Sequence, residues 1–357
     1  MVKRFGILTS GGDAPGLNAA IRALCISAKK NWGMEAVAVK NGYRGLIQGD
    51  MELFDEEKFP YLLSSGGTVL GTSREKPFKN PVPDAQTGML PVEAMRANYE
   101  KWNLDALVCL GGNGTNTTAS KLSESGFNVI GLPKTIDNDI VKTDVTFGFH
   151  TAVNVATDAI DRIHSTAESH GRIMIVEVMG HKAGWLGLYS GTAGGADVIL
   201  LPEIPYNIDS VAKKIEERQK AGYKHSIIVV AEGAKNPEES KMSKKEFKAA
   251  RAEMTSSIAY MVSKELQETM SIESRVSVLG YLQRGGSPCP YDRLLSTRFG
   301  TAAAEFLAKE DFGKLVAIQN DKITGVPLKE IAGLVKNVPE DSAVIKSARS
   351  VGICFGD

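Results

Sequence analysis

Two carboxylates separated by one residue are the side chains of this sequence best suited to acid–base chemistry. Asp137 and Asp139 flank Asn138, shortly after an apolar segment, 129–132, that reads as a buried strand. At strand spacing, residues i and i+2 project to the same side of the backbone. One carboxylate can then accept a proton from a substrate hydroxyl while the other helps to hold a metal ion. The pair could equally cap a turn, so the residues alone leave both interpretations open.

Glycine pairs at 11–12, 66–67 and 111–112 are candidates for phosphate binding. A loop between a strand and a helix presents backbone N–H groups at the positive end of the helix dipole, where anions bind. Glycine also lets the backbone approach a phosphate closely. One such loop could be a simple tight turn, whereas three favour a phosphate-bearing ligand. Neither the Walker A pattern nor a GxGxxG in the first turn is present, which lowers the case for a P-loop or dinucleotide site.

Several cations stand near these segments. Arg74 follows a glycine-rich stretch, Arg172 opens a predicted strand, Arg275 precedes one, and Arg284 precedes a further glycine pair. Lys134 lies close to the carboxylates. Arginine offers planar paired donors that match phosphate. A single arginine is more often a solvated surface residue, but the glycine contexts of Arg74 and Arg284 favour a phosphate partner.

Composition narrows the class of protein. The 357 residues contain 42 Lys plus Arg and 42 Asp plus Glu, so no global field attracts nucleic acid or an anionic membrane. No apolar run has the length of a membrane span. The cysteines lack metal-binding spacing and indicate a reducing, cytoplasmic location; they are Cys25, Cys109, Cys289 and Cys354.

Strand-like and helical patterns alternate along the chain, which predicts an α/β fold with mostly parallel sheets. The first part of the chain gives strands at 5–9, 34–39, 104–110 and 129–132, with helices at 18–30, 91–102 and 116–123 and a loop at 111–115. A long helix at 151–167 begins a second lobe. That lobe has strands at 172–179 and 226–230, helices near 209–219 and 245–268, and a polar loop at 236–243.

Five colinear segments resemble the 6-phosphofructokinases. They are residues 8–18, 66–74, 133–139, 177–180 and 280–288. The resemblance implies two Rossmann-like three-layer αβα lobes with the active site in the cleft between them. Residues 1–148 and about 285–318 would form the ATP-binding lobe. Residues 149–284 and about 319–357 would form the sugar-phosphate lobe.

The same resemblance implies phosphorylation of fructose 6-phosphate at its 1-hydroxyl, with ATP and Mg²⁺, to fructose 1,6-bisphosphate in glycolysis. Asp137 would be the base, Asp139 would organise Mg²⁺, Thr135 would lie beside the sugar, and Arg74 would stabilise the transferring group. The donor would contact Gly11, Arg74, Lys134, Gly111, Gly112, Asn113, Gly114 and Thr115. The sugar phosphate would contact Thr135, Asp137, Met179, Gly180, His181, Glu232, Tyr281 and Arg284. Arg172 and Arg275 would serve a neighbouring subunit's site, which requires a homotetramer or homodimer.

The chain departs from the family pattern at a few positions. Asn113 stands where an Asp near Mg²⁺ is usual, so Asp139 would carry more of the metal's charge. Gly114 is typical of ATP users because an Asp there would repel the nucleotide, whereas Lys134 is typical of pyrophosphate users. We favour ATP, because a blocking side chain excludes a ligand more firmly than an added cation does. His181 and Tyr281 replace the usual Arg and His.

Other functions stay open at this level. Pyrophosphate remains the alternative donor, and sedoheptulose 7-phosphate an alternative acceptor. A NAD or lipid kinase shares the glycine-rich loop but not the segments at 133–139 and 280–288. A non-catalytic regulatory subunit would explain Asn113, but the intact Asp137 argues against it.

Overall fold

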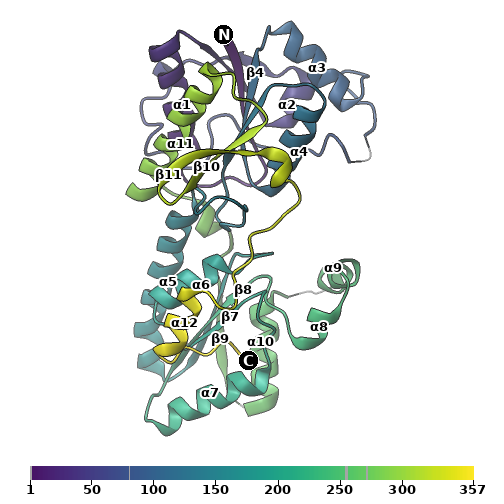
Figure 1. Ribbon diagram of the computed structural model, residues 1–357. Coiled ribbons are helices and arrows are strands. Elements are labelled where there is room, and N and C mark those ends of the chain that lie inside the picture. The colour runs from purple at the N-terminus through teal and green to yellow at the C-terminus, as the bar shows by residue number, and fades with distance from the viewer. Residues whose placement is uncertain (1, 80, 254–255, 271) are drawn as a thin grey trace. The chain divides into compact units, whose positions relative to one another are not determined.

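A computed structural model describes residues 2–79, 81–253, 256–270 and 272–357 (Figure 1). The chain divides into two compact units. Unit 1 comprises Met1–Thr151 and Arg284–Val335, and unit 2 comprises Ala152–Gln283 and Lys336–Asp357. Each unit has a sheet covered by helices, so the expected α/β class with mostly parallel sheets is confirmed.

Unit 1 is built on a seven-stranded sheet with the order β11-β10-β5-β4-β1-β2-β3. Its strands are β1 (Arg4–Ser10), β2 (Glu35–Val39), β3 (Met51–Leu53), β4 (Ala106–Gly111), β5 (Val129–Pro133), β10 (Lys314–Gln319) and β11 (Lys322–Pro327). The central strands run parallel, whereas β3 and β11 are antiparallel at the two edges. The central strands β1, β4 and β5 are almost wholly buried, as strands covered on both faces must be.

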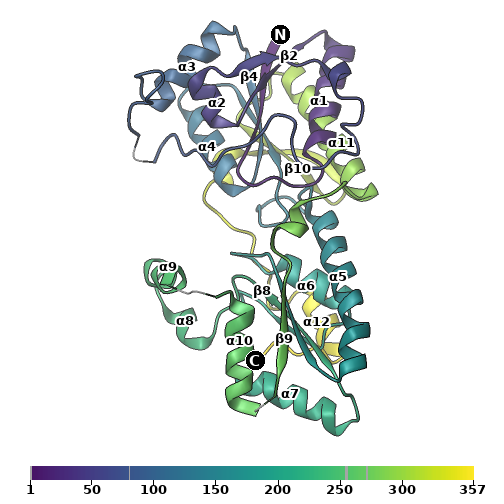
Figure 2. The same cartoon turned by 180° about the vertical axis from the view of Figure 1, so that it is seen from behind.

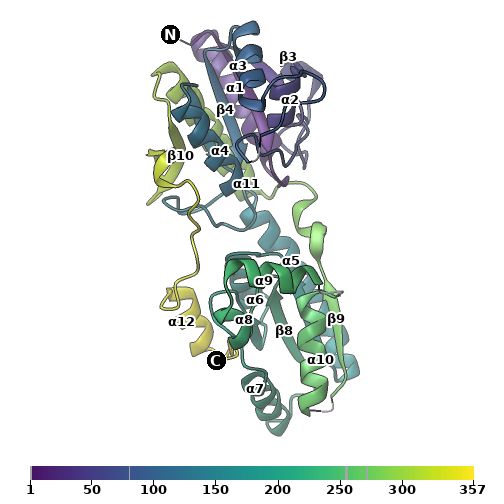
Figure 3. The same ribbon diagram turned by 90° about the vertical axis from the view of Figure 1, so that its right-hand side faces the viewer.

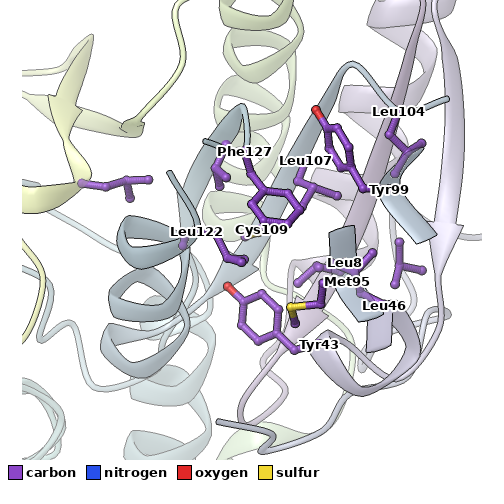
Figure 4. Close-up of a cluster of buried hydrophobic side chains, with 14 of the residues drawn as sticks. Leu8, Tyr43, Leu46, Met95, Tyr99, Leu104, Leu107, Cys109, Leu122 and Phe127 are labelled. Carbon is purple, nitrogen blue, oxygen red and sulfur yellow. The ribbon is translucent and has the colours of Figure 1, made fainter. Parts of the chain in front are cut away.

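Helices cover both faces of this sheet (Figure 2). On one face α1 (Leu17–Trp32) packs along α11 (Pro290–Ala308), and the two approach closely at Gly300, where an added Cβ would lie 2.5 Å from the Ala20 carbonyl oxygen. The other face carries α2 (Tyr43–Gln48), α3 (Pro91–Lys101) and α4 (Asn113–Glu124). Apolar side chains of these helices, including Tyr43 and Met95, pack on Leu8 and Leu107 of the sheet (Figure 4).

Unit 2 has a four-stranded parallel sheet with the order β7-β8-β6-β9 (Figure 3). Its strands are β6 (Ile173–Val178), β7 (Val198–Leu200), β8 (Ser226–Ala231) and β9 (Ser274–Val278). One apolar cluster joins the sheet to α5 (Phe149–His170), α6 (Trp185–Ala193) and α12 (Ala343–Ser350). A second joins its other face to α7 (Ile208–Lys220) and α10 (Ile258–Met270). The described residues also form short 3₁₀ turns in both units. In unit 1 these are η1 (Glu56–Lys58) and η3 (Leu328–Glu330), and η2 (Gly280–Arg284) follows β9 of unit 2.

The structure corrects three expectations from the sequence. The segment expected as a loop at 236–243 contains α8 (Pro237–Lys241), because Asn236 and Glu239 form a reciprocal capping box ahead of it. The single helix expected over 245–268 is two helices, α9 (Lys244–Glu253) and α10. Residues 319–335, assigned to the sugar-phosphate lobe, lie in unit 1, because β11 forms a hairpin with β10.

The last residues of the chain extend the sheet of unit 2. The Ile199 amide donates to the Cys354 carbonyl at 2.9 Å, and the Cys354 amide donates to the Asp197 carbonyl at 3.0 Å. This segment therefore covers the β7 edge, and Phe355 beside it is completely buried. Within the described residues, no helix is long and apolar enough to cross a membrane.

The buried tail predicts a stability effect. Phe355→Ala should lower the free energy of unfolding by about 3–5 kcal/mol, because it removes a fully buried ring from the core of unit 2. Val351, four residues earlier, is 77% exposed, so Val351→Ala should change stability by less than about 0.5 kcal/mol. Urea unfolding of both variants measures the difference. Equal midpoints for the two variants would mean that the tail contributes nothing to the core.

Candidate active site

Three neighbouring strands of unit 1 end at one edge of the sheet. Ser10 of β1 pairs with Gly111 of β4, and Gly111 pairs with Pro133 of β5. The glycine turn after β1, the start of α4 after β4 and the carboxylate segment after β5 therefore meet there. In open α/β sheets this carboxyl edge is where ligands bind.

The turn after β1 is fastened to the segment that carries Arg74. Gly11 has φ of 86°, a left-handed conformation that favours glycine. Its amide donates to the Ser73 carbonyl at 2.9 Å, and the Thr72 hydroxyl donates to the Gly11 carbonyl at 2.6 Å. These bonds hold Arg74 beside Gly11, and both residues line the same cavity.

That cavity has a volume of about 630 Å³ and lies wholly within unit 1. Gly11 and Arg74 line one part of it, and Gly114 and Thr115 of α4 line another. A Cβ added to Gly111 would lie 2.2 Å from the Thr115 hydroxyl oxygen, so position 111 requires glycine. A Cβ added to Gly114 would have no atom within 4 Å, so position 114 opens onto free space.

The expected loop at 111–115 is shorter than predicted, since α4 already begins at Asn113. The Asn113 carbonyl accepts from the Thr117 hydroxyl at 2.7 Å within the first turn. The Asn113 side-chain amide donates to the Asp139 carboxylate at 2.7 Å and to the Asp139 carbonyl at 3.1 Å. The start of α4 is thus tied to the carboxylate segment.

A tight turn holds the two aspartates. The Asp137 amide donates to the Thr135 hydroxyl at 3.1 Å, and the Thr146 hydroxyl donates to the Thr135 carbonyl at 2.7 Å. Asn138 is left-handed, with φ of 50°, and its side-chain oxygen accepts from the Thr146 amide at 3.1 Å. Asp139 is only 7% exposed. The segment is a braced turn, and the same turn carries both carboxylates.

Two cations lie against the glycine turn. The Lys134 ammonium donates to the Gly12 carbonyl, and the Arg284 guanidinium donates to the Asp13 carbonyl at 3.1 Å. Lys134 is 3% exposed, and burial, followed by the nearby Arg284 guanidinium, lowers the pKa of its amine to about 8. A Cβ at Gly12 would lie 2.4 Å from the Arg284 guanidinium, so glycine permits this approach.

The third glycine pair has a different place. Gly66 is a close-approach position, because an added Cβ would lie 2.1 Å from the Gly286 carbonyl oxygen. Gly66 therefore packs against the turn after Arg284, whereas Gly67 has a left-handed backbone with φ of 65° and open space around it. Neither residue is among those that line the cavity. Close packing at Gly66 and the left-handed backbone at Gly67 are each a reason for glycine in a tight turn.

Unit 2 places most of the expected acceptor residues at the carboxyl end of its sheet. A cavity of about 190 Å³ is lined by Met179, Glu232 and Tyr281, and an adjoining one of about 200 Å³ by His181 and Glu232. The Met179 amide donates to the Gln283 side chain at 3.2 Å. Gly180, with φ of 131°, makes the turn between Met179 and His181.

Arg172 and Arg275 lie at the other end of the same sheet. Arg172 immediately precedes β6 and Met179 immediately follows it, a separation of about 23 Å at the rise of an extended strand. Arg275 pairs with Met174, near the start of β6, and forms an ion pair with Glu273 at 2.5 Å. Within one subunit, these arginines are therefore remote from Met179 and Glu232.

Several residues around the unit 1 cavity were not found from the sequence. Phe78, Lys79 and Lys121 line it, with the Lys121 ammonium 5.5 Å from the centre of the Phe78 ring. Tyr43 lies beneath it, where its hydroxyl donates to the Thr115 carbonyl at 2.9 Å. Phe78 is close in sequence to Arg74, and this proximity could have marked it as a residue of the cavity. Nothing in the sequences of α2 and α4 pointed to Tyr43 or Lys121.

Comparison with known proteins agrees with this geometry. Residues 4–307 match the family described as phosphofructokinase. An ATP-dependent 6-phosphofructokinase of Spirochaeta thermophila is 56% identical over 99% of this chain and 98% of its own length. The ATP-dependent 6-phosphofructokinase 3 of Bacteroides thetaiotaomicron is 49% identical over 99% of this chain and 100% of its own.

A solved structure gives the same result. The crystal structure of Pichia pastoris phosphofructokinase superposes with a TM-score of 0.81 at 30% identity, over 99% of this chain. This chain spans 37% of the length of that larger one. The resemblance drawn from the sequence motifs is confirmed: the chain belongs to the phosphofructokinase family.

Proposed function

We propose that this protein transfers the terminal phosphoryl group of ATP to the 1-hydroxyl of fructose 6-phosphate, forming fructose 1,6-bisphosphate and ADP in glycolysis. The observation that carries the proposal is the unit 1 cavity, in which Gly11, Arg74 and the open position Gly114 stand together. Its volume of about 630 Å³ is in the range of small-molecule sites. The names of the relatives, ATP-dependent 6-phosphofructokinases at up to 56% identity, support the same donor and acceptor.

Asp137 acts as the general base. Its carboxylate takes the proton of the 1-hydroxyl as the hydroxyl oxygen forms a bond to the terminal phosphorus, and the bond from that phosphorus to the ADP oxygen breaks. The reaction passes through a loose transition state, so positioning and charge neutralisation dominate over base strength. The braced turn of Thr135 and Thr146 supports this role because it limits the motion of the carboxylate.

Arg74 and Lys134 supply positive charge to the donor phosphates. The glycines at 11, 111 and 112 let those phosphates approach the backbone closely. Thr115 and Asn113 belong to the first turn of α4, whose dipole favours an anion. These residues would lower the energy of the phosphoryl group as its charge redistributes.

Mg²⁺ fits the residues present. Among the described residues, no group of three or more His, Cys, Asp or Glu side chains is arranged to hold a metal ion. Mg²⁺ in phosphoryl-transfer enzymes usually takes only one or two carboxylates and completes its shell with substrate phosphates and water. Asp139, at the edge that carries Asp137, would supply the carboxylate. When bound, the ion would neutralise charge on the donor phosphates.

The acceptor would lie against Met179, Gly180, His181, Glu232, Tyr281 and Arg284. Arg172 and Arg275 lie at the opposite end of the unit 2 sheet from Met179 and Glu232, which supports their service to a neighbouring subunit's acceptor. The complete site would then need a homodimer or homotetramer. None of the four cysteines forms a disulfide within the described residues, which supports a cytoplasmic location, since oxidising compartments favour disulfides.

The pKa of Lys134 predicts a pH dependence. The value of kcat/KM for ATP should fall as pH rises above about 8, because the amine loses the proton that attracts the donor phosphates. In Lys134→Met the constant should be lower but lack this inflection. Lys309→Met, a change of the exposed lysine at the C-cap of α11, should keep the wild-type profile. An inflection that persists in Lys134→Met would assign it to another group.

The donor assay tests the proposal as a whole. Formation of fructose 1,6-bisphosphate is measured with Mg²⁺ and either ATP or pyrophosphate. We expect kcat/KM to favour ATP by about 100-fold, or about 2.7 kcal/mol of transition-state discrimination. Preference for pyrophosphate would mean that the buried cation Lys134, which favours that alternative, outweighs the open position at Gly114. Absence of turnover with either donor would reject the phosphofructokinase activity.

A further inference from the structure

The amide of Asn113 has only one possible orientation. Its nitrogen lies 2.7 Å from a carboxylate oxygen of Asp139 and 3.1 Å from the Asp139 carbonyl oxygen. Both partners only accept hydrogen bonds, and an amide nitrogen has two protons to donate. The nitrogen must therefore face Asp139.

This contact joins two segments that the sequence separates. Asn113 is the first residue of α4, and its position is fixed by Gly112 before it and by the bond from Thr117. Asp139 closes the turn after β5 and is 7% exposed. The amide thus holds the carboxylate from the side of α4.

We propose that Asn113 is a positioning residue that holds the Asp139 carboxylate in place for the metal ion through these two hydrogen bonds. The inference rests on the proposed function, because the ion is the Mg²⁺ that would accompany ATP. It adds a positioning role to the expectation that Asn113 lies at the metal. Groups that orient a metal-binding carboxylate typically contribute about 10- to 100-fold in metal affinity or activity.

Charge explains why a neutral amide serves here. An aspartate of the same shape at position 113 would place an oxygen 2.7 Å from the Asp139 carboxylate. In the metal-free protein these two carboxylates would repel each other, as like charges at this distance do. Asn113 converts that repulsion into a charge-assisted hydrogen bond, so the carboxylate is held before the donor arrives.

The first test is the thermal stability of the metal-free protein. Asn113→Ala loses two hydrogen bonds, and Asn113→Asp loses them and adds a repulsion, so the midpoint of Asn113→Asp should be the lower of the two. Asn98→Ala is the matched control. Its amide also donates two bonds, to the Leu46 and Ile47 carbonyls at 3.0 Å each, but lies on α3. Equal midpoints for Asn113→Asp and wild type would overturn the inference.

The second test measures the free Mg²⁺ concentration that gives half the maximal rate, with ATP and fructose 6-phosphate saturating. Asn113→Ala should raise it about 10-fold, while Asn98→Ala should leave it unchanged even though its midpoint falls. An unchanged Mg²⁺ requirement in Asn113→Ala would overturn this inference but not the proposed function. A wild-type protein without phosphotransfer would overturn the proposed function, whatever the variants show.

Discussion

Asp137→Asn should lower kcat by about 10²- to 10⁴-fold with both substrates saturating, the range in which a general base contributes. An amide of the same shape keeps the packing of the turn but cannot take the proton of the sugar hydroxyl. The bonds that brace the turn come from Thr135 and Thr146, and the substitution leaves both in place. Steady-state kinetics of fructose 1,6-bisphosphate formation measure the loss.

The control for Asp137→Asn is ligand binding without turnover. Thermal shifts produced by ADP and by fructose 6-phosphate should be close to those of wild type, since the backbone that carries Arg74 and Gly11 is unchanged. The thermal midpoint without ligands should also stay within a few degrees. A kcat reduced by less than about 10-fold, with normal binding, would mean that another group takes the proton.

Gly114→Asp should reduce kcat/KM for ATP by about 100-fold or more, equivalent to about 2.7 kcal/mol. An added Cβ at position 114 has free space around it, and the position lines the unit 1 cavity. A carboxylate there would occupy space beside the donor and repel its phosphates, which is how an unfavourable contact creates specificity. The constant for pyrophosphate should fall much less, so the ratio of the two constants is the informative measurement.

Gly114→Ala tests whether a loss in Gly114→Asp comes from the added carboxylate or from the loss of glycine's backbone freedom. Its methyl group has no atom within 4 Å, so activity with ATP should stay within a few fold of wild type. If Gly114→Ala loses as much activity as Gly114→Asp, the residue is needed for its backbone rather than for open space. If neither variant affects ATP, the nucleotide does not pass this position.

Local patterns in the sequence predicted the elements around the unit 1 cavity. Apolar runs of strand length predict β1, β4 and β5, because the side chains on both faces of a covered strand are buried and therefore mostly apolar. Glycine pairs after β1 and β4 mark the turns at Gly11 and Gly111, where left-handed backbone or close approach excludes other residues. The proposed base and the cations Arg74 and Lys134 also stood out, since their types and their neighbours in sequence suit phosphate chemistry.

The sequence-based prediction was wrong where a polar segment forms a helix with the help of a capping box. The segment 236–243 looks like a loop because its residues are polar. The capping box of Asn236 and Glu239 nevertheless stabilises a short helix there, through hydrogen bonds between close neighbours. The hairpin of β10 and β11 carried 319–335 into unit 1 because antiparallel pairing needs only a short turn, which composition does not reveal.

Only the tertiary structure decided which distant residues meet. Asn113 and Asp139 are 26 positions apart, and Lys134 and Gly12 are 122 apart, yet each pair is in hydrogen-bond contact. Arg172 and Met179 lie at opposite ends of β6, although they are only seven positions apart in the sequence. Neither fact is local: a sequence pattern reports the periodicity of one segment, whereas strand order and register set which segment ends share an edge. The sequence therefore predicted the chemistry of the side chains, whereas only the tertiary structure determined the orientation of the Asn113 amide.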